Sequence, residues 1–233
     1  MTRIEVTDLM RQLDEIVGPV EGDDPKVLKR VRILDAAEAL FIRQGYVKTS
    51  MDEVAREAGV AKGTLYLYFK SKEELFLAAL ESELSQWFSE LDALIRDSTP
   101  MSVDVFADGL AASLAARPRL LELMSLLHNV LEHNVDVDAS RSFKRTLLGH
   151  LQDASTGVEA ALPDLPAGAA PLLLMRMYAL VVGYRQMADP APNVAEALTA
   201  ADLAPLRVDF EKDIAAALVD LIHGMCVTPP ASR

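Results

Sequence analysis

The chain has 233 residues, of which 51% are hydrophobic, so it can form one or two folded domains and most of it cannot be disordered. Its net charge of −12 is unevenly distributed. Residues 26–72 hold ten basic and five acidic side chains, for a local charge of +5, whereas residues 1–25 and 73–233 carry −5 and −12. Because phosphate binding depends on local charge, the acidic remainder does not exclude DNA as a partner.

Three features predict a cytoplasmic protein without membrane contact. Cys226 is the single cysteine and has no disulfide partner, which agrees with a reducing compartment. The first twenty residues mix acidic with apolar side chains, unlike a signal peptide. The most apolar run, residues 169–184, is too short to span a bilayer and contains Arg176.

The first two segments of the chain are an extension and a helix. Residues 1–25 are the predicted N-terminal extension, with a short amphipathic helix followed by a linker. The next helix begins near Pro25, a favoured first-turn residue, with Asp24 as its N-cap, and ends at Gly45. Its expected core stripe is apolar at helical spacing and consists of Val31, Leu34, Ala37, Leu40 and Phe41.

Residues 49–72 predict a helix-turn-helix. Ser50 and Glu53 have the spacing of a capping box, and Gly59 follows where the short helix must stop and the chain must turn. An ordinary helical hairpin is the alternative, but its second helix would carry apolar packing residues. Here that helix is polar and aromatic at Lys62, Gly63, Thr64, Tyr66 and Tyr68. Residues 26–72 are therefore predicted to form a three-helix DNA-binding head.

Residues 73–228 predict a helical body for ligand binding and dimerisation. Ser71 and Glu74 form a second capping box before a long helix that runs to about Arg96. Further helices are expected over residues 102–117, 118–134, 140–161, 169–188 and 208–224, with a short turn of helix near 194–203. No strand-type alternation persists, so the predicted fold is all-α, with the head followed by a helical bundle.

The helix ending in RQGY, the block TSMDEVAREAGVAKGTLYLYFKSKEEL and the long helix after it resemble the TetR/AcrR family of one-component repressors, over roughly residues 28–80. The resemblance implies a homodimer that binds operator DNA and is released when a small molecule occupies the C-terminal domain. It also implies that Lys62, Thr64 and Tyr66 lie on the recognition helix. The contacts to the DNA backbone that it implies fall on Thr49, Tyr68 and Lys72. Family members often carry Ser or Thr where this chain has Ala61, so the cap of the recognition helix is weaker here.

The chemistry of these residues agrees with contact to DNA. Lys62 can reach a phosphate or a guanine edge, and Gly63 allows DNA to approach the backbone closely. The methyl and hydroxyl groups of Thr64 suit a thymine or a phosphate.

The effector site is predicted between the long helix and the helices that face it. We expect a cavity of roughly 300 Å³ or more, with an apolar wall and three polar groups, lined by Trp87, Phe88, Met124, His128, Phe143, Met175 and Tyr178. The alternative is that these seven side chains fill a solid core. Because no basic cluster lies at these positions, we expect a largely apolar effector without phosphate, although Arg176 could pair with a carboxylate.

His128 allows three interpretations: a core histidine on the apolar helix 118–134, a residue that contacts the effector, or, with Glu132 one turn later, a metal ligand. We expect no metal and no cofactor. The sequence has no nucleophile elbow, phosphate loop or cysteine–histidine pair, so an enzyme is not expected.

Helices 169–188 and 208–224 are too apolar for one-sided burial, which predicts a four-helix bundle with a second subunit, and Gly183 would permit close approach.

A DNA-organising protein of the same fold, without a ligand, is the alternative to a repressor.

Overall fold

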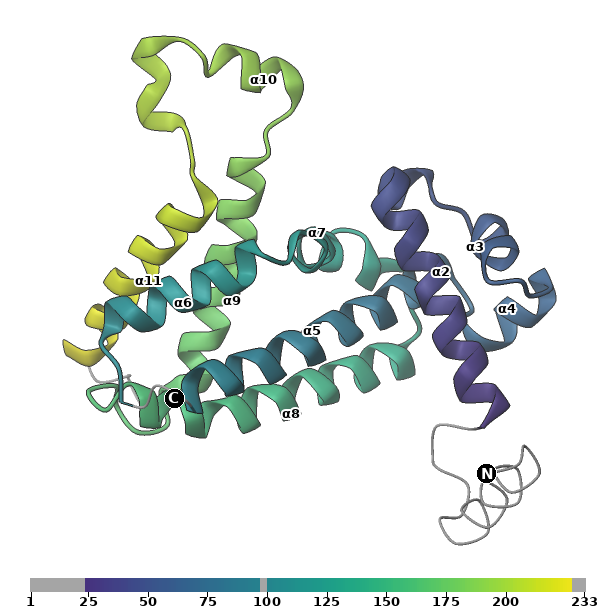
Figure 1. Ribbon diagram of the computed structural model, residues 1–233, viewed down its shortest axis with the longest axis horizontal. Helices are drawn as coiled ribbons and strands as arrows, with labels where there is room; N and C mark the ends of the chain where they lie inside the picture. Colours follow the sequence, from purple (N-terminus) through teal and green to yellow (C-terminus); the bar gives the residue numbers. More distant parts are fainter. Residues whose placement is uncertain (1–23, 97–99, 228–233) are drawn as a thin grey trace, which may run out of the picture. The chain divides into compact units, whose positions relative to one another are not determined.

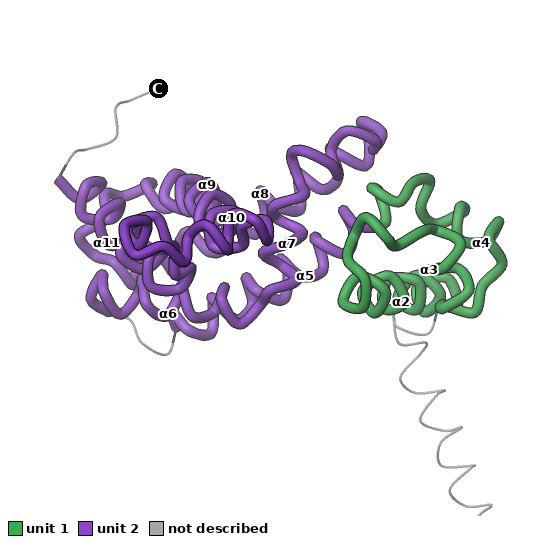
Figure 2. Tube along the Cα trace, turned by 90° about the horizontal axis from the view of Figure 1, so that it is seen from above, with its two compact units in different colours: residues 1–75 green, residues 76–233 purple. Residues whose placement is uncertain are grey.

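The computed structural model describes residues 24–96 and 100–227, so the amphipathic helix predicted within residues 1–20 lies outside the described residues. All regular secondary structure in the described part is helical (Figure 1), which confirms the predicted all-α class. The chain divides into two compact units, residues 1–75 and 76–233 (Figure 2). The head predicted from the sequence ends at residue 72, and the first unit ends at residue 75.

The first unit, which we call the head, holds α2 (Pro25–Lys48), α3 (Met51–Glu57) and α4 (Lys62–Tyr68). The Asp24 carboxylate caps α2 by accepting a hydrogen bond from the Lys26 amide at 2.8 Å, as predicted. Near its end α2 kinks at Gly45, where φ is 74°. Val31 is 46% exposed, so its predicted place in the core is wrong. The buried stripe consists of Ile33, Leu34, Ala36, Ala37, Leu40 and Phe41, which recur at the helical period.

The second unit, the body, contains most of α5 (Lys72–Arg96) together with α6 (Val103–Ala115), α7 (Pro118–Leu127), α8 (Val137–Ala161), α9 (Ala170–Ala188) and α11 (Phe210–Val227). α11 packs on α6 and α9, and α9 also packs on α7 and α8. The core between them is apolar, and its fully buried members include Phe76, Leu80, Leu91, Phe106, Leu110, Leu120, Ile214 and Ile222.

The predicted single helix over residues 118–134 is broken in the structure. α7 ends at Leu127, a short 3₁₀ helix, η1 (Leu131–Asn134), follows, and α8 starts at Val137 rather than at 140. Asn129 and Val130 are weak helix formers at the break, and Val130 has a φ of −131°. The Asp136 carboxylate then accepts a hydrogen bond from the Ala139 amide at 2.8 Å, which fixes the early start of α8.

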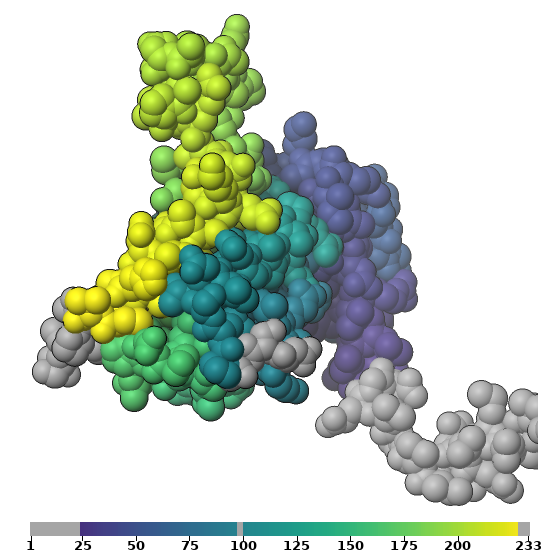
Figure 3. Space-filling view, turned by 60° about the vertical axis from the view of Figure 1, so that its left-hand side comes forward, coloured from purple at the N-terminus to yellow at the C-terminus, as the bar shows by residue number. Residues whose placement is uncertain are grey.

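Between α9 and α11 the chain leaves the packed helices as an arm, residues 190–208, which contains α10 (Pro192–Ala197) and η2 (Ala201–Leu206) (Figures 1 and 3). No residue of α10 or η2 is buried. Arg207 donates hydrogen bonds to the carbonyls of three consecutive residues, Leu198, Thr199 and Ala200, at 2.6, 2.9 and 3.0 Å. The arm is therefore held by one guanidinium rather than by an apolar core.

Within the described part of the chain, no helix combines the length and the apolar character that crossing a membrane requires.

Candidate DNA-binding surface and ligand cavity

The turn between α3 and α4 is fixed by a glycine and by an arginine from α2. Gly59 has a φ of 65°, and a Cβ atom there would lie 3.2 Å from Arg32 Nη2. Arg32 Nη2 donates a hydrogen bond to the Ala58 carbonyl at 2.8 Å. The capping box of α3 forms as predicted: the Glu53 amide donates to the Ser50 hydroxyl at 3.3 Å, and the Ser50 amide donates to the Glu53 carboxylate at 3.0 Å.

One side of α4 is anchored and the other faces solvent. Leu65 is completely buried and holds the helix on the head core. Lys62, Gly63 and Tyr66 are exposed, Tyr66 by 42%, while Thr64 and Tyr68 are half-buried. Five of the predicted DNA-contacting residues thus lie on one short helix. Ala61 caps it without a side-chain hydrogen bond, as the sequence implied.

Lys62 is paired in the structure with an acidic residue of α3. Its Nζ atom lies 2.7 Å from Asp52 Oδ1, and both side chains are mostly exposed. The hydrogen bond and the charge of Asp52 raise the pKa of Lys62. A DNA phosphate or base must therefore compete with Asp52 for the Lys62 ammonium.

Two predicted DNA contacts, Thr49 and Lys72, use their side chains inside the head instead. Thr49 is only 2% exposed, and its hydroxyl donates to the Gly45 carbonyl at 2.9 Å. Lys72 donates to the Tyr46 carbonyl and lies 3.9 Å from the centre of the Tyr46 ring, and burial lowers the pKa of Lys72. Both side chains stabilise the end of α2, so neither is presented to a phosphate in this structure, and their contact with DNA stays a prediction.

Leu67 is an exposed apolar residue of α4 that sequence reasoning did not include among the candidate DNA contacts. It is 85% exposed, between Tyr66 and Tyr68 on α4. The sequence contains a signal for this exposure: Leu67 follows the buried Leu65 by two residues, and helical residues two apart point to different faces. An exposed apolar side chain here can contact a thymine methyl group in the major groove.

The body has an apolar cavity among α5, α7, α8 and α9, with a volume of about 80 Å³. Six of the seven predicted residues line it: Trp87, Phe88, Met124, His128, Met175 and Tyr178. The cavity is smaller than the expected 300 Å³ because leucine and methionine side chains occupy the space, among them Leu84, Leu147, Leu151 and Met177. Methionine repacks readily, so such a wall can open around a ligand.

Two of the predicted cavity groups are not available to a ligand. Phe143 is buried, but it does not line the cavity. The indole N–H of Trp87 donates to the Ser113 hydroxyl at 3.1 Å, so it is not one of the three expected polar groups. The Tyr178 hydroxyl reaches the Met124 carbonyl only at 3.4 Å, and burial, reinforced by the charge of Glu132, raises the pKa of Tyr178 to about 12.

His128 lies at the rim of the cavity and is not a core residue. Its side chain is 54% exposed because α7 ends at this point, which corrects the core interpretation. Its ring meets the Tyr178 ring edge-on, with centres 5.6 Å apart, and its Nδ1 atom lies 2.9 Å from Glu132 Oε2. No group of three or more potential metal-ligating side chains is found among residues 24–96 and 100–227.

Lys144 supplies the positive charge at the cavity, whereas Arg176 is exposed and does not line it. Lys144 forms an ion pair with Glu132 Oε1. Burial opposes ionisation of Glu132, but hydrogen bonds from Lys144 and His128 hold its pKa below the ordinary value. Sequence reasoning missed Lys144, although it precedes Leu147 and Leu151 at helical spacing on the same face of α8.

A second hollow, between α5 and α8, holds a serine–histidine pair. Ser85 Oγ and His150 Nε2 are 2.9 Å apart, and the His150 ring stacks on Phe88 at 5.2 Å. The Ser85 hydroxyl already donates to the Glu81 carbonyl at 2.9 Å, so it accepts from His150. In this arrangement the histidine is a donor to the serine and not a base that activates it.

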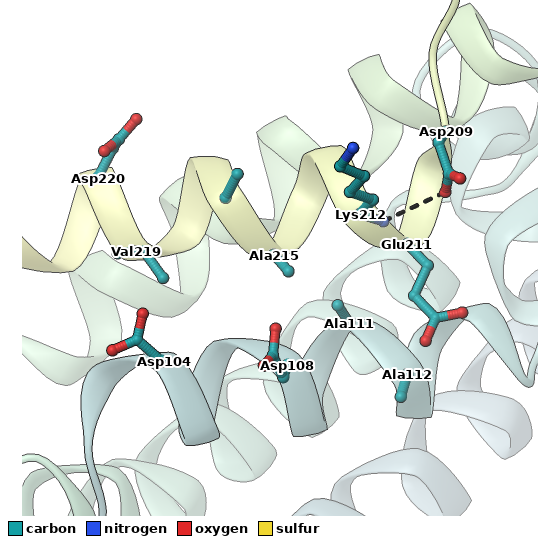
Figure 4. Close-up of a pocket in the computed structure, with 11 residues that line it drawn as sticks. Asp104, Asp108, Ala111, Ala112, Asp209, Glu211, Lys212, Ala215, Val219 and Asp220 are labelled. Atoms are coloured by element: carbon teal, nitrogen blue, oxygen red, sulfur yellow. Dashed lines mark hydrogen bonds between the residues drawn. The ribbon is translucent and has the colours of Figure 1, made fainter.

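A third hollow is the open groove between α6 and α11, with a volume of about 740 Å³ (Figure 4). Asp104 and Asp108 of α6 lie along it with Asp220 of α11. Its floor is formed mainly by small residues, which allow the two helices to pack closely: Ala111, Ala112, Ala215 and Ala216. The groove is acidic and open, and it does not have the enclosed apolar wall of the cavity beside Trp87.

The chain matches two family models. One is described as "Tetracyclin repressor-like, C-terminal domain" and matches residues 81–229. The other is described as "Bacterial regulatory proteins, tetR family" and matches residues 33–79.

Similar proteins include a fatty acid metabolism regulator protein of Bacillus subtilis, 33% identical over 69 residues, which are 30% of this chain and 36% of that protein. The HTH-type transcriptional repressor KstR of Mycolicibacterium smegmatis is 34% identical over 135 residues, 57% of this chain and 63% of that protein. The chain thus covers less than two thirds of the length of either relative. A crystal structure of a TetR/AcrR-family regulator from Thermobifida fusca covers 83% of this chain and 96% of its own, with a TM-score of 0.54 and 18% identity, and so shares the fold.

Proposed function

Because the chain belongs to the TetR family of bacterial transcriptional regulators, we propose that it is a one-component repressor that binds operator DNA as a homodimer and is released by a small, largely apolar effector. The observation that carries this proposal is the exposed polar face of α4. Its residues lie on a helix-turn-helix that is anchored by Leu65 and belongs to the one segment of positive charge.

The proposed base contacts are Lys62, Thr64, Tyr66 and the newly recognised Leu67, with Gly63 admitting close approach. The Gly63 position supports this role because a Cβ there would meet no atom within 4 Å, so the protein itself does not require the glycine. Tyr68 is proposed to contact the DNA backbone. One short helix reads only a few base pairs, so two heads are needed for a specific site.

The proposed dimer forms through α9 and α11. On α9, Leu172, Leu180 and Met187 are partly or largely exposed and lie on one helical face with Gly183. Gly183 of α9 and Gly224 of α11 both have open space where a side chain would be. Apolar side chains around two such glycines suit close helix packing across a two-fold axis.

A stable monomer at micromolar concentration in sedimentation velocity would contradict this interface.

The proposed effector site is the apolar cavity among α5, α7, α8 and α9. Because α5 begins in the head and forms one wall of this cavity, a ligand that displaces Leu84, Trp87 or Phe88 would act on the helix that joins the two units. Its small volume of about 80 Å³ is the observation that favours the alternative, a DNA-organising protein of the same fold without a ligand.

The test is selection of bound sequences from a random duplex library by the full chain, followed by an anisotropy titration on the selected site. We expect one palindromic site, bound by a dimer, with weaker binding when an apolar effector is added. Failure to enrich any sequence would overturn the repressor assignment. An enriched site whose affinity is unaffected by every cavity-binding molecule would favour the DNA-organising alternative.

A further inference from the structure

The apolar cavity has three polar groups in its lining, and one of them, the Lys144 ammonium, is positively charged. The wall is apolar apart from Lys144, His128 and Tyr178, and no carboxylate lines it. An ammonium group is a donor only, and a phenol readily donates. Such a rim offers a ligand one positive charge with its donors, and no negative charge.

Glu132 lies behind this rim and holds two of its members. Its Oε1 atom pairs with Lys144 and its Oε2 atom lies 2.9 Å from His128 Nδ1, yet Glu132 does not line the cavity. Because an ionised carboxylate can only accept, His128 carries its hydrogen on Nδ1. An ammonium has three N–H donors, and among the described residues Lys144 donates a hydrogen bond to Glu132 alone.

We propose that the effector is an amphipathic carboxylate, whose apolar body lies between α5 and α9 and whose carboxylate binds Lys144 at the rim. This inference rests on the proposed role of the cavity as the effector site. A carboxylate satisfies the remaining donors of the ammonium with charge-assisted bonds, which are stronger than neutral ones. The hydroxyl of Tyr178 can turn from its long contact with Met124 to donate a further bond.

Other classes of ligand fit the rim less well. A cationic amphiphile would place its charge beside Lys144. A neutral hydrocarbon or alcohol would fill the apolar wall but would gain no charge-assisted bond. A ligand carboxylate also competes with Glu132 for Lys144, and this pair joins η1 to α8. Effector binding would therefore loosen the segment that follows α7.

The experiment uses three probes with the same apolar chain: dodecanoate, dodecan-1-ol and dodecyltrimethylammonium, each below its micellar concentration. Binding to the full chain is measured by calorimetry without DNA. Trp87 is the single tryptophan and lines the cavity, so its emission locates the bound probe. We expect dodecanoate to bind at least about tenfold more tightly than the alcohol, the scale of one hydrogen bond to a charged group. Equal affinity for the alcohol, tighter binding of the cation, or no binding of dodecanoate would overturn the proposal.

Two variants with opposite expected effects separate ligand contact from a structural role. Lys144→Met keeps the apolar stem and should weaken dodecanoate about tenfold or more, to the level of the alcohol. Glu132→Gln removes the competing charge and should tighten dodecanoate binding. Arg145→Met is the matched control, because this neighbouring cation of α8 is exposed and does not line the cavity. If both Lys144→Met and Glu132→Gln weaken binding of all three probes equally, the pair is structural and the proposal fails.

The outcome is separate from the test of the repressor. Selective dodecanoate binding without any effect on DNA affinity would leave the ligand class standing and remove the proposed release mechanism. A normal operator complex without carboxylate selectivity would leave the repressor assignment standing and remove the proposed ligand class.

Discussion

The head and the body present their functional side chains in opposite ways. On α4, Lys62, Tyr66 and Leu67 stand in solvent around one buried anchor, Leu65. Around the body cavity, Trp87, Phe88 and Met124 are buried and leave only about 80 Å³ between them. The head is therefore ready for a large rigid partner without rearrangement of its core, whereas the body must move side chains before it can admit a ligand.

The largest effect is expected on DNA affinity, from substitutions of the exposed residues of α4 in the head. Tyr66→Ala should leave the fold intact and reduce operator affinity by about 1–3 kcal/mol in each head, because one base contact is lost per subunit. Lys62→Ala should weaken binding in the same direction. Anisotropy titrations on the selected operator measure both, with Lys212→Ala of the body as the control for loss of one exposed lysine. Unchanged affinity in both head variants would remove α4 from sequence readout.

The second prediction concerns a buried charge in the body. Glu83 is 2% exposed and lies 3.3 Å from Arg117 and 2.9 Å from Arg119. Glu83→Ala leaves both arginines without this partner, so the free energy of unfolding should fall by about 3 kcal/mol. Chemical denaturation measures the loss. Glu90→Ala removes the other, mostly exposed carboxylate that pairs with Arg117, and its effect should be much smaller. Equal losses would mean that burial does not distinguish the two pairs.

The third prediction compares two glycines of the helix-turn-helix. Gly59→Ala should destabilise the head by about 1–2 kcal/mol, because its φ of 65° suits only glycine well. Gly63→Ala, where the added Cβ meets no atom within 4 Å, should preserve stability and weaken DNA binding. Thermal melts and operator titrations on both variants separate the two roles. A stable Gly59→Ala protein, or a Gly63→Ala protein that binds DNA normally, would contradict the assignment.

The smallest effect is expected at the pair between α3 and α4. Asp52→Asn frees the Lys62 ammonium from its partner at 2.7 Å, so DNA affinity should rise severalfold at low salt. The gain should shrink as salt is added, because both side chains are exposed and their interaction is screened. Titrations at two salt concentrations measure it. A loss of affinity would show that Asp52 positions Lys62 rather than competing for it.

Much of the head was predictable from the sequence because its signals are local. The capping box at Ser50, the turn at Gly59 and the family resemblance over residues 28–80 are all confirmed. The inward turn of Lys72 was not predictable, because it depends on the Tyr46 carbonyl, which only the folded head brings near. Thr49 bonds a carbonyl only four residues back, and what the sequence did not indicate is its burial by the packing of the head.

The body was predictable as a set of helices but less so as a site. Spacing along each helix identified the wall of the cavity, and six of seven residues line it. Lys144 shares the spacing of Leu147 and Leu151, but its pairing with Glu132 could not be predicted, because it depends on the break after Leu127 that carries Glu132 toward α8. The volume of the cavity likewise follows from packing between helices, which no single helix encodes.

The arm between α9 and α11 should be less stable to local unfolding than the packed helices of the body. Its short helices bury no side chain, and its loop carbonyls are held by Arg207. A segment with so few buried contacts opens by itself, without unfolding the helices on either side. Its amides should therefore exchange with solvent deuterium long before those of α9 and α11. A longer, shorter or absent arm should then have little consequence for the cavity.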